Sequence, residues 1–126
     1  MNADHTAPWL PEQGHAEQLM ILLHGVGSEG RAMSPLARVL RHAFPQAALW
    51  TPDGFDAFDM GPAGRQWFSV RGVDEANRVE RVTAVLPRLA DAVRAVQVRT
   101  GVGPAATALV GFSQGSILSL ELAQLH

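Results

Sequence analysis

The residues best suited to chemistry form the pentad Gly111-Phe112-Ser113-Gln114-Gly115, with the spacing Gly-x-Ser-x-Gly. Apolar residues 107–112 predict a strand buried on both faces, and the leucine-rich residues after the pentad predict a helix buried on most sides. A serine in such a sharp turn is a nucleophile elbow, whose strained backbone favours glycine two residues before and after it. The N–H groups at the helix start suit a developing oxyanion. A turn serine can simply cap a helix, but this context favours Ser113 as a nucleophile.

A second glycine motif follows the apolar strand expected at 18–24. Gly25, Gly27 and Gly30 fit G-x-G-x-x-G, and Asp53 stands at the end of the next expected strand. This arrangement is typical of a dinucleotide site, where glycines let the backbone approach a pyrophosphate and an acid binds a ribose hydroxyl. It is the main alternative to a hydrolase.

The same loop, taken from His24 to Gly27, also fits an oxyanion loop that turns a backbone N–H toward a nucleophile. The N–H groups of Val26 and Gln114 would then be the two donors. We prefer this interpretation because one site explains both glycine motifs. A long loop after the second strand is also unusual for a nucleotide-binding unit. We expect His24 itself to be structural, with hydrogen bonds inside the loop.

Four segments together resemble a known family, namely bacterial esterases of the YpfH type in the carboxylesterase/phospholipase group of α/β-hydrolases. They are residues 22–27, 62–70, 77–78 and the pentad at 111–115. This group also contains the acyl-protein thioesterases. The resemblance implies hydrolysis of carboxylic esters or thioesters through an acyl-enzyme on Ser113, without metal or cofactor. It also implies that Val26 and Gln114 form the oxyanion hole and that Trp67 and Phe68 line an acyl pocket, although both aromatics suit an ordinary core equally well.

A catalytic base is missing from the sequence pattern. In α/β-hydrolases the acid and the histidine follow the serine, and here only Glu121 and His126 do so. Both lie on the expected last helix, roughly 12 Å and roughly 20 Å along its axis. We therefore expect the N-terminal part of a hydrolase, with little or no turnover, and with an apolar strand edge left unpaired. A non-catalytic remnant is the third hypothesis.

The remaining elements predict an α/β fold. Strands at 18–24, 47–51 and 107–112 alternate with helices at 31–44 and 73–100, the second interrupted by Pro87, and a loop spans 54–72. We expect residues 1–17 to form a polar arm with a short edge strand around Trp9. Residues 18–126 would form the N-terminal portion of a three-layer, parallel α/β-hydrolase domain.

Composition narrows the functional classes further. The chain has 126 residues, a formal net charge of −2 and no cysteine. A basic field for nucleic acid is therefore absent, and disulfides and thiolate metal sites are excluded. Since no leader or membrane span is visible, we expect a cytoplasmic protein whose partner is a small ester or thioester.

Overall fold

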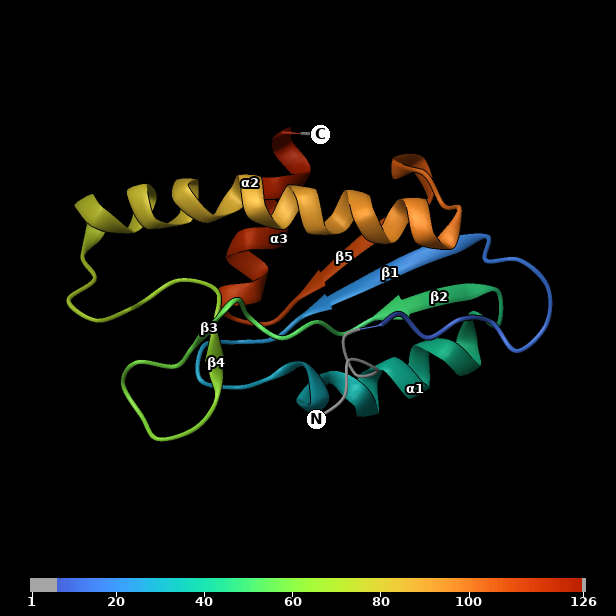
Figure 1. Ribbon diagram of the computed structural model, residues 1–126, viewed down its shortest axis with the longest axis horizontal. Helices are drawn as coiled ribbons and strands as arrows, with labels where there is room; N and C mark the ends of the chain where they lie inside the picture. The colour runs from blue at the N-terminus through green and yellow to red at the C-terminus, as the bar shows by residue number, and fades with distance from the viewer. Residues whose placement is uncertain (1–6, 126) are drawn as a thin grey trace.

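The computed structural model describes residues 7–125, which form a parallel sheet with helices on both faces (Figure 1). The sheet has the order β2-β1-β5. Its strands are β1 (Gln18–Leu23), β2 (Ala47–Trp50) and β5 (Thr107–Gly111), and the helices are α1 (Ser34–Ala43), α2 (Glu75–Thr100) and α3 (Gln114–Leu125). Two 3-10 turns, η2 (Gly30–Met33) and η3 (Pro104–Ala106), precede α1 and β5. The three-layer α/β architecture expected from the sequence is confirmed.

Strand β1 lies at the centre of the sheet and divides the core by the alternation of its side chains. Leu19, Ile21 and Leu23 belong to the larger apolar cluster, which contains residues of α2 and α3. Met20 and Leu22 point to the other face and pack in the cluster that contains Ala37 of α1. Because successive side chains of a strand point to opposite faces, this one apolar strand joins both helix layers.

Strand β5 is only half-buried, which corrects the expectation of burial on both faces. It pairs with β1 on one side, and within residues 7–125 its other edge has no strand partner. Ala108 is exposed and Phe112 is 67% exposed. Likewise α3 buries Leu118 and Leu122 but leaves Leu120 on the surface. The unpaired apolar edge that the sequence predicted is therefore present.

Helix α1 begins at Ser34 rather than Arg31, because a 3-10 turn occupies the four positions before it. It contacts the sheet through the small side chain of Ala37, which is fully buried. In the sequence, the apolar stripe of this helix includes Leu36 and Val39, but both side chains are exposed.

Helix α2 runs without a break across Pro87, contrary to the expected division at this residue. Its start is fixed by a reciprocal capping box between Asp74 and Asn77, and Gly101 ends it in a left-handed conformation. Apolar residues that recur every three or four positions form a stripe on this helix, which is buried from Val82 onward. Val79 is exposed because the first turns extend beyond the sheet (Figure 1).

The segment expected as a loop at 54–72 contains a small antiparallel hairpin of β3 (Asp56–Ala57) and β4 (Arg65–Gln66). In the N-terminal arm, the backbone of Trp9 forms an isolated antiparallel bridge with Leu49 of β2. None of the described helices combines the length and the apolar character that a membrane crossing requires.

Candidate active site

Ser113 lies at the carboxyl edge of the sheet, in the turn between β5 and α3. Leu23 pairs with Gly111, and the N–H of Phe112 donates to the Leu23 carbonyl at 3.0 Å. Ser113 has φ 54, and no other non-glycine residue in the described chain has a positive φ. This is the strained elbow that the pentad predicted, and strain of this kind often accompanies function.

The two glycines of the pentad are required by close backbone contacts. A Cβ on Gly111 would overlap with the backbone of Gly115, and a Cβ on Gly115 would overlap with the carbonyl of Leu23. The end of β5 and the start of α3 therefore come too close for any side chain at these positions. The serine is presented outward, where its side chain is exposed.

The loop after β1 lies directly beside the serine. A Cβ built on Gly25 would meet the Cβ of Ser113 at 3.3 Å. Within residues 7–125, the backbone N–H groups of Val26 and Gln114 have no hydrogen-bond acceptor. The two N–H groups that the sequence analysis singled out therefore lie on the two segments that flank Ser113.

The β3–β4 hairpin holds this loop from its other side. The N–H of Gly27 donates to the Arg65 carbonyl at 2.8 Å, and the N–H of Arg65 donates to the Ser28 carbonyl at 2.7 Å. The Arg65 guanidinium also donates to the carbonyls of Gly54 and Phe55, at 3.0 and 3.1 Å. Sequence reasoning did not identify Arg65, and only its place in the Trp-Phe segment hinted at a role.

His24 is fully buried and serves the structure, as expected. Its Nε2 accepts from the Gly54 N–H at 2.8 Å, so the ring proton lies on Nδ1, which donates to the Gly25 carbonyl at 2.7 Å. Burial lowers the pKa of His24 below its ordinary value, which keeps the ring neutral. With both nitrogens occupied, His24 is not positioned as a base for Ser113.

Trp67 and Phe68 are buried in the larger core cluster, so their side chains are core residues in this structure. The Trp67 indole N–H donates to the His24 carbonyl at 3.0 Å. The Trp67 ring lies 5.2 Å from the rings of both His24 and Phe55. The Trp67–Phe68 backbone, by contrast, is bound to the side chain of Gln114 and so lies next to the elbow.

No hydrogen bond joins the Ser113 hydroxyl to a histidine or a carboxylate within residues 7–125. Glu121 lies on α3, and His42 lies on α1 on the opposite face of the sheet. His5 and His126 lie outside the described residues. The structure therefore places Ser113 beside the loops that contain Val26 and Gln114, and within residues 7–125 it places no base beside the hydroxyl.

The alternative dinucleotide site is poorly supported by the geometry. The Asp53 carboxylate accepts from the Gly30 N–H at 2.8 Å, so it connects the segment after β2 to the end of the glycine loop. A Cβ on Gly30 would overlap with the carbonyl of Thr51, which explains this glycine by packing.

In the described chain, no three histidine or acidic side chains come together as metal ligands.

Comparisons with known proteins agree with this geometry. The sequence profile of a family described as Phospholipase/Carboxylesterase matches residues 10–125. Esterase YpfH of Escherichia coli (strain K12) is 44% identical over 121 residues, which cover 96% of this chain and 51% of YpfH. Acyl-protein thioesterase 1 of Cryptococcus neoformans is 27% identical, over 87% of this chain and 49% of its own length.

Solved structures give the same result. Esterase PE8 superposes with a TM-score of 0.85 at 31% identity, covering 93% of this chain and 55% of that protein. A carboxylesterase from Mesorhizobium loti, at 24% identity and a TM-score of 0.67, supports the fold. The chain thus spans about half the length of the relatives it matches.

Proposed function

Because the chain belongs to the phospholipase/carboxylesterase family, we propose that it carries the nucleophile and the oxyanion donors of a serine hydrolase acting on carboxylic esters or thioesters. The observation that carries the proposal is Ser113 in its strained turn, flanked by two unpaired N–H groups on neighbouring loops. A turn serine that only capped the helix would require neither feature.

In the proposed reaction, the Ser113 Oγ attacks the carbonyl carbon of the substrate. The N–H groups of Val26 and Gln114 donate to the oxyanion as the carbonyl becomes tetrahedral. The bond to the alcohol or thiol then breaks, and the leaving group takes the proton that the serine gave up. Water attacks the acyl-enzyme, releases the acid and returns a proton to Ser113.

This chemistry needs a general base for the serine proton, and none contacts Ser113 in residues 7–125. We therefore propose that the 126-residue chain holds the substrate-activating half of the site and turns over slowly. The Trp67–Phe68 segment is proposed to form the wall of the acyl pocket, through its backbone position beside the elbow.

Labelling with a fluorophosphonate tests the nucleophile directly, because the reagent forms a stable bond to an activated serine. We expect slow labelling that peptide mapping assigns to Ser113, with Ser113→Ala as the matched control. Ser119, buried on the next turn of α3, should stay unlabelled. Labelling spread evenly over the serines, and unchanged in Ser113→Ala, would contradict the proposal.

Hydrolysis of a p-nitrophenyl ester by the purified chain tests the missing base. We expect a rate near that of Ser113→Ala. A robust rate abolished by this substitution would show that a base acts within the chain. Saturable quenching of tryptophan fluorescence by NAD, without serine labelling, would instead favour the dinucleotide alternative.

A further inference from the structure

The side chain of Gln114 forms a pair of hydrogen bonds that resembles strand pairing. Its Oε1 accepts from the Trp67 N–H at 2.9 Å, and its Nε2 donates to the Phe68 carbonyl at 2.9 Å. The residue is 3% exposed, and its partners lie more than 40 residues earlier in the chain. We call this pair of contacts the Gln114 clamp.

The segment that the clamp holds is also attached to the other side of the site. The Trp67 indole N–H donates to the His24 carbonyl, one residue before the loop that contains Val26. The Trp67–Phe68 segment therefore connects the loop after β1 to the elbow after β5. Those are the two loops that carry the candidate oxyanion donors.

We propose that Gln114 is a positioning residue, whose side chain fixes the Trp67–Phe68 segment against the elbow and so sets the spacing of the Val26 and Gln114 N–H groups. This inference rests on the proposed serine hydrolase function. It assigns two separate tasks to one residue. The Gln114 N–H donates to the oxyanion, and the Gln114 side chain holds the Trp67–Phe68 segment in place.

Only glutamine satisfies the clamp at neutral pH. The site needs one acceptor and one donor at the end of a three-carbon side chain. Asparagine is one methylene too short, methionine has the length but no donor, and a glutamate carboxylate would face the Phe68 carbonyl with no proton to donate. A protonated glutamic acid, however, offers both a donor and an acceptor.

Two variants and one control test the clamp. In Gln114→Met, the two buried partners on the segment lose their bonds, so we expect exchange of the Trp67 amide to accelerate about tenfold or more. Ser113 labelling should slow by a similar factor, although the Gln114 N–H is retained. Gln97→Met is the matched control, because Gln97 also bridges two elements, from α2 to the Thr107 hydroxyl at 3.0 Å. It should leave the Trp67 amide and Ser113 labelling unchanged.

Gln114→Glu adds a readout that packing alone would not produce. We expect protection of the Trp67 amide, corrected for intrinsic exchange, to be restored at acidic pH and lost at neutral pH. If Gln114→Met fails to fold, the pH dependence of Trp67 protection in Gln114→Glu still tests the clamp. The proposal is overturned if protection is independent of pH in Gln114→Glu, or if Gln97→Met changes labelling as much as Gln114→Met. If Ser113 is unlabelled in the wild type while the clamp behaves as expected, the proposed hydrolase function fails instead.

Discussion

His24 shows how a single buried side chain can hold several loops together. Its ring joins the Gly54 turn to the loop after β1, and its carbonyl receives the indole of Trp67. The two ring contacts are those of a neutral imidazole, with Nδ1 as the donor and Nε2 as the acceptor. A protonated ring has no acceptor nitrogen, so it would leave the Gly54 N–H without a partner.

This arrangement predicts a loss of stability in mild acid. The folded pKa of His24 is lowered, whereas the unfolded value is about 6.5, so the unfolded chain binds more protons as the pH falls below that value. The free energy of unfolding should therefore decrease as the pH falls below about 6.5, and His24 contributes a slope of at most about 1.4 kcal/mol per pH unit. Urea unfolding measured from about pH 6.5 down to about pH 5 tests this decrease.

The matched variants for that titration are His24→Gln and His42→Gln. Gln at position 24 cannot be protonated, so the slope between pH 6.5 and pH 5 should flatten, even if overall stability is lower. His42 is exposed on α1, and its replacement should preserve the wild-type slope. An equal slope in all three proteins would show that His24 does not govern this pH range.

At the same scale, the sequence identified some site residues and missed others for a physical reason. Ser113 and the glycines around it were found because an elbow is a local structure with a fixed spacing. The Gln114 clamp and the contacts of Arg65 join segments far apart in the chain, and no local pattern records them. Trp67 was identified by resemblance, and its burial in the core agrees with one of the two interpretations that the sequence left open, but its contact with the His24 carbonyl was not predicted.

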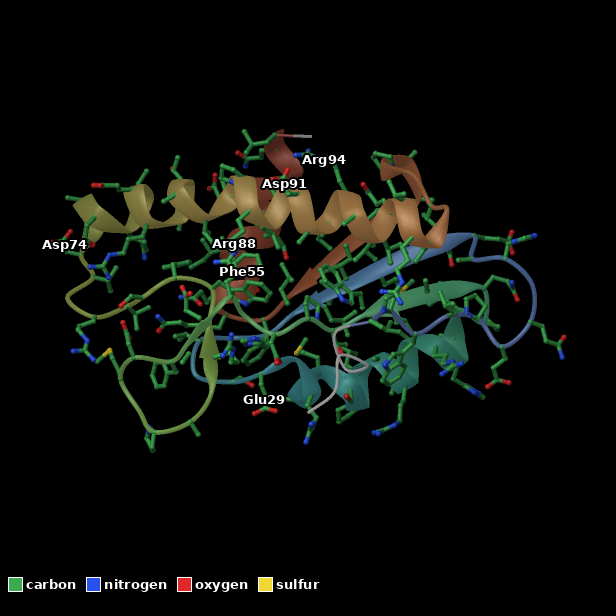
Figure 2. All side chains as sticks on the ribbon, viewed as in Figure 1. Glu29, Phe55, Asp74, Arg88, Asp91 and Arg94 are labelled. Atoms are coloured by element: carbon green, nitrogen blue, oxygen red, sulfur yellow. The ribbon has the colours of Figure 1, made fainter. Side chains whose placement is uncertain are left out.

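Among the elements, helix α2 is the long support of the larger core, and it also holds the loop beneath it. Arg81 donates to the Ser69 carbonyl at 2.7 Å. Arg88 lies over the Phe55 ring at 4.3 Å, and Phe55 in turn packs edge-on against Trp67 (Figure 2). The helix therefore supports the segment around Trp67 in two ways. Arg81 and Arg88 contact it from α2, and the buried apolar residues of α2 pack in the same core cluster as Trp67.

The proline inside α2 should cost stability. Pro87 is exposed and has no N–H to donate to the preceding turn, yet the helix continues through it. Pro87→Ala restores a donor and removes the ring clash, so we expect the free energy of unfolding to rise by about 1–3 kcal/mol. Chemical denaturation measures the difference.

Thr83→Ala is the control for that experiment, because Thr83 is exposed one turn earlier on the same helix. It alters helix propensity without restoring a hydrogen bond, so its gain should be smaller, below about 0.7 kcal/mol. If Pro87→Ala is neutral or destabilising, then α2 depends on the local geometry that the proline imposes. The sequence predicted the extent of this helix but not its continuity, because packing of Leu86 and Leu89 in the core outweighs the proline penalty.

At the scale of the whole molecule, the described chain has a sheet with one apolar edge and a groove beside it. The groove, of about 400 Å³, lies between α2, β5 and α3. Val93, Leu109 and Leu120 are among its lining residues. Arg94 also lines it and pairs with Asp91 on the same helix (Figure 2). The relatives are about twice as long as this chain, and in this chain β5 and α3 are only partly buried.

An unpaired apolar strand edge beside an apolar groove favours association between copies of the chain. We expect the 126-residue protein to self-associate as its concentration rises, in sedimentation velocity measurements. Leu120 is 66% exposed at the groove, and burying it on association is worth about 1.5–3 kcal/mol. Leu120→Glu should therefore weaken association at least about tenfold.

Val98→Glu is the matched control, because Val98 is 84% exposed on α2 and does not line the groove. A wild-type protein that stays monomeric at high concentration, or equal effects of the two substitutions, would show that the β5 edge and its groove do not drive contacts between copies.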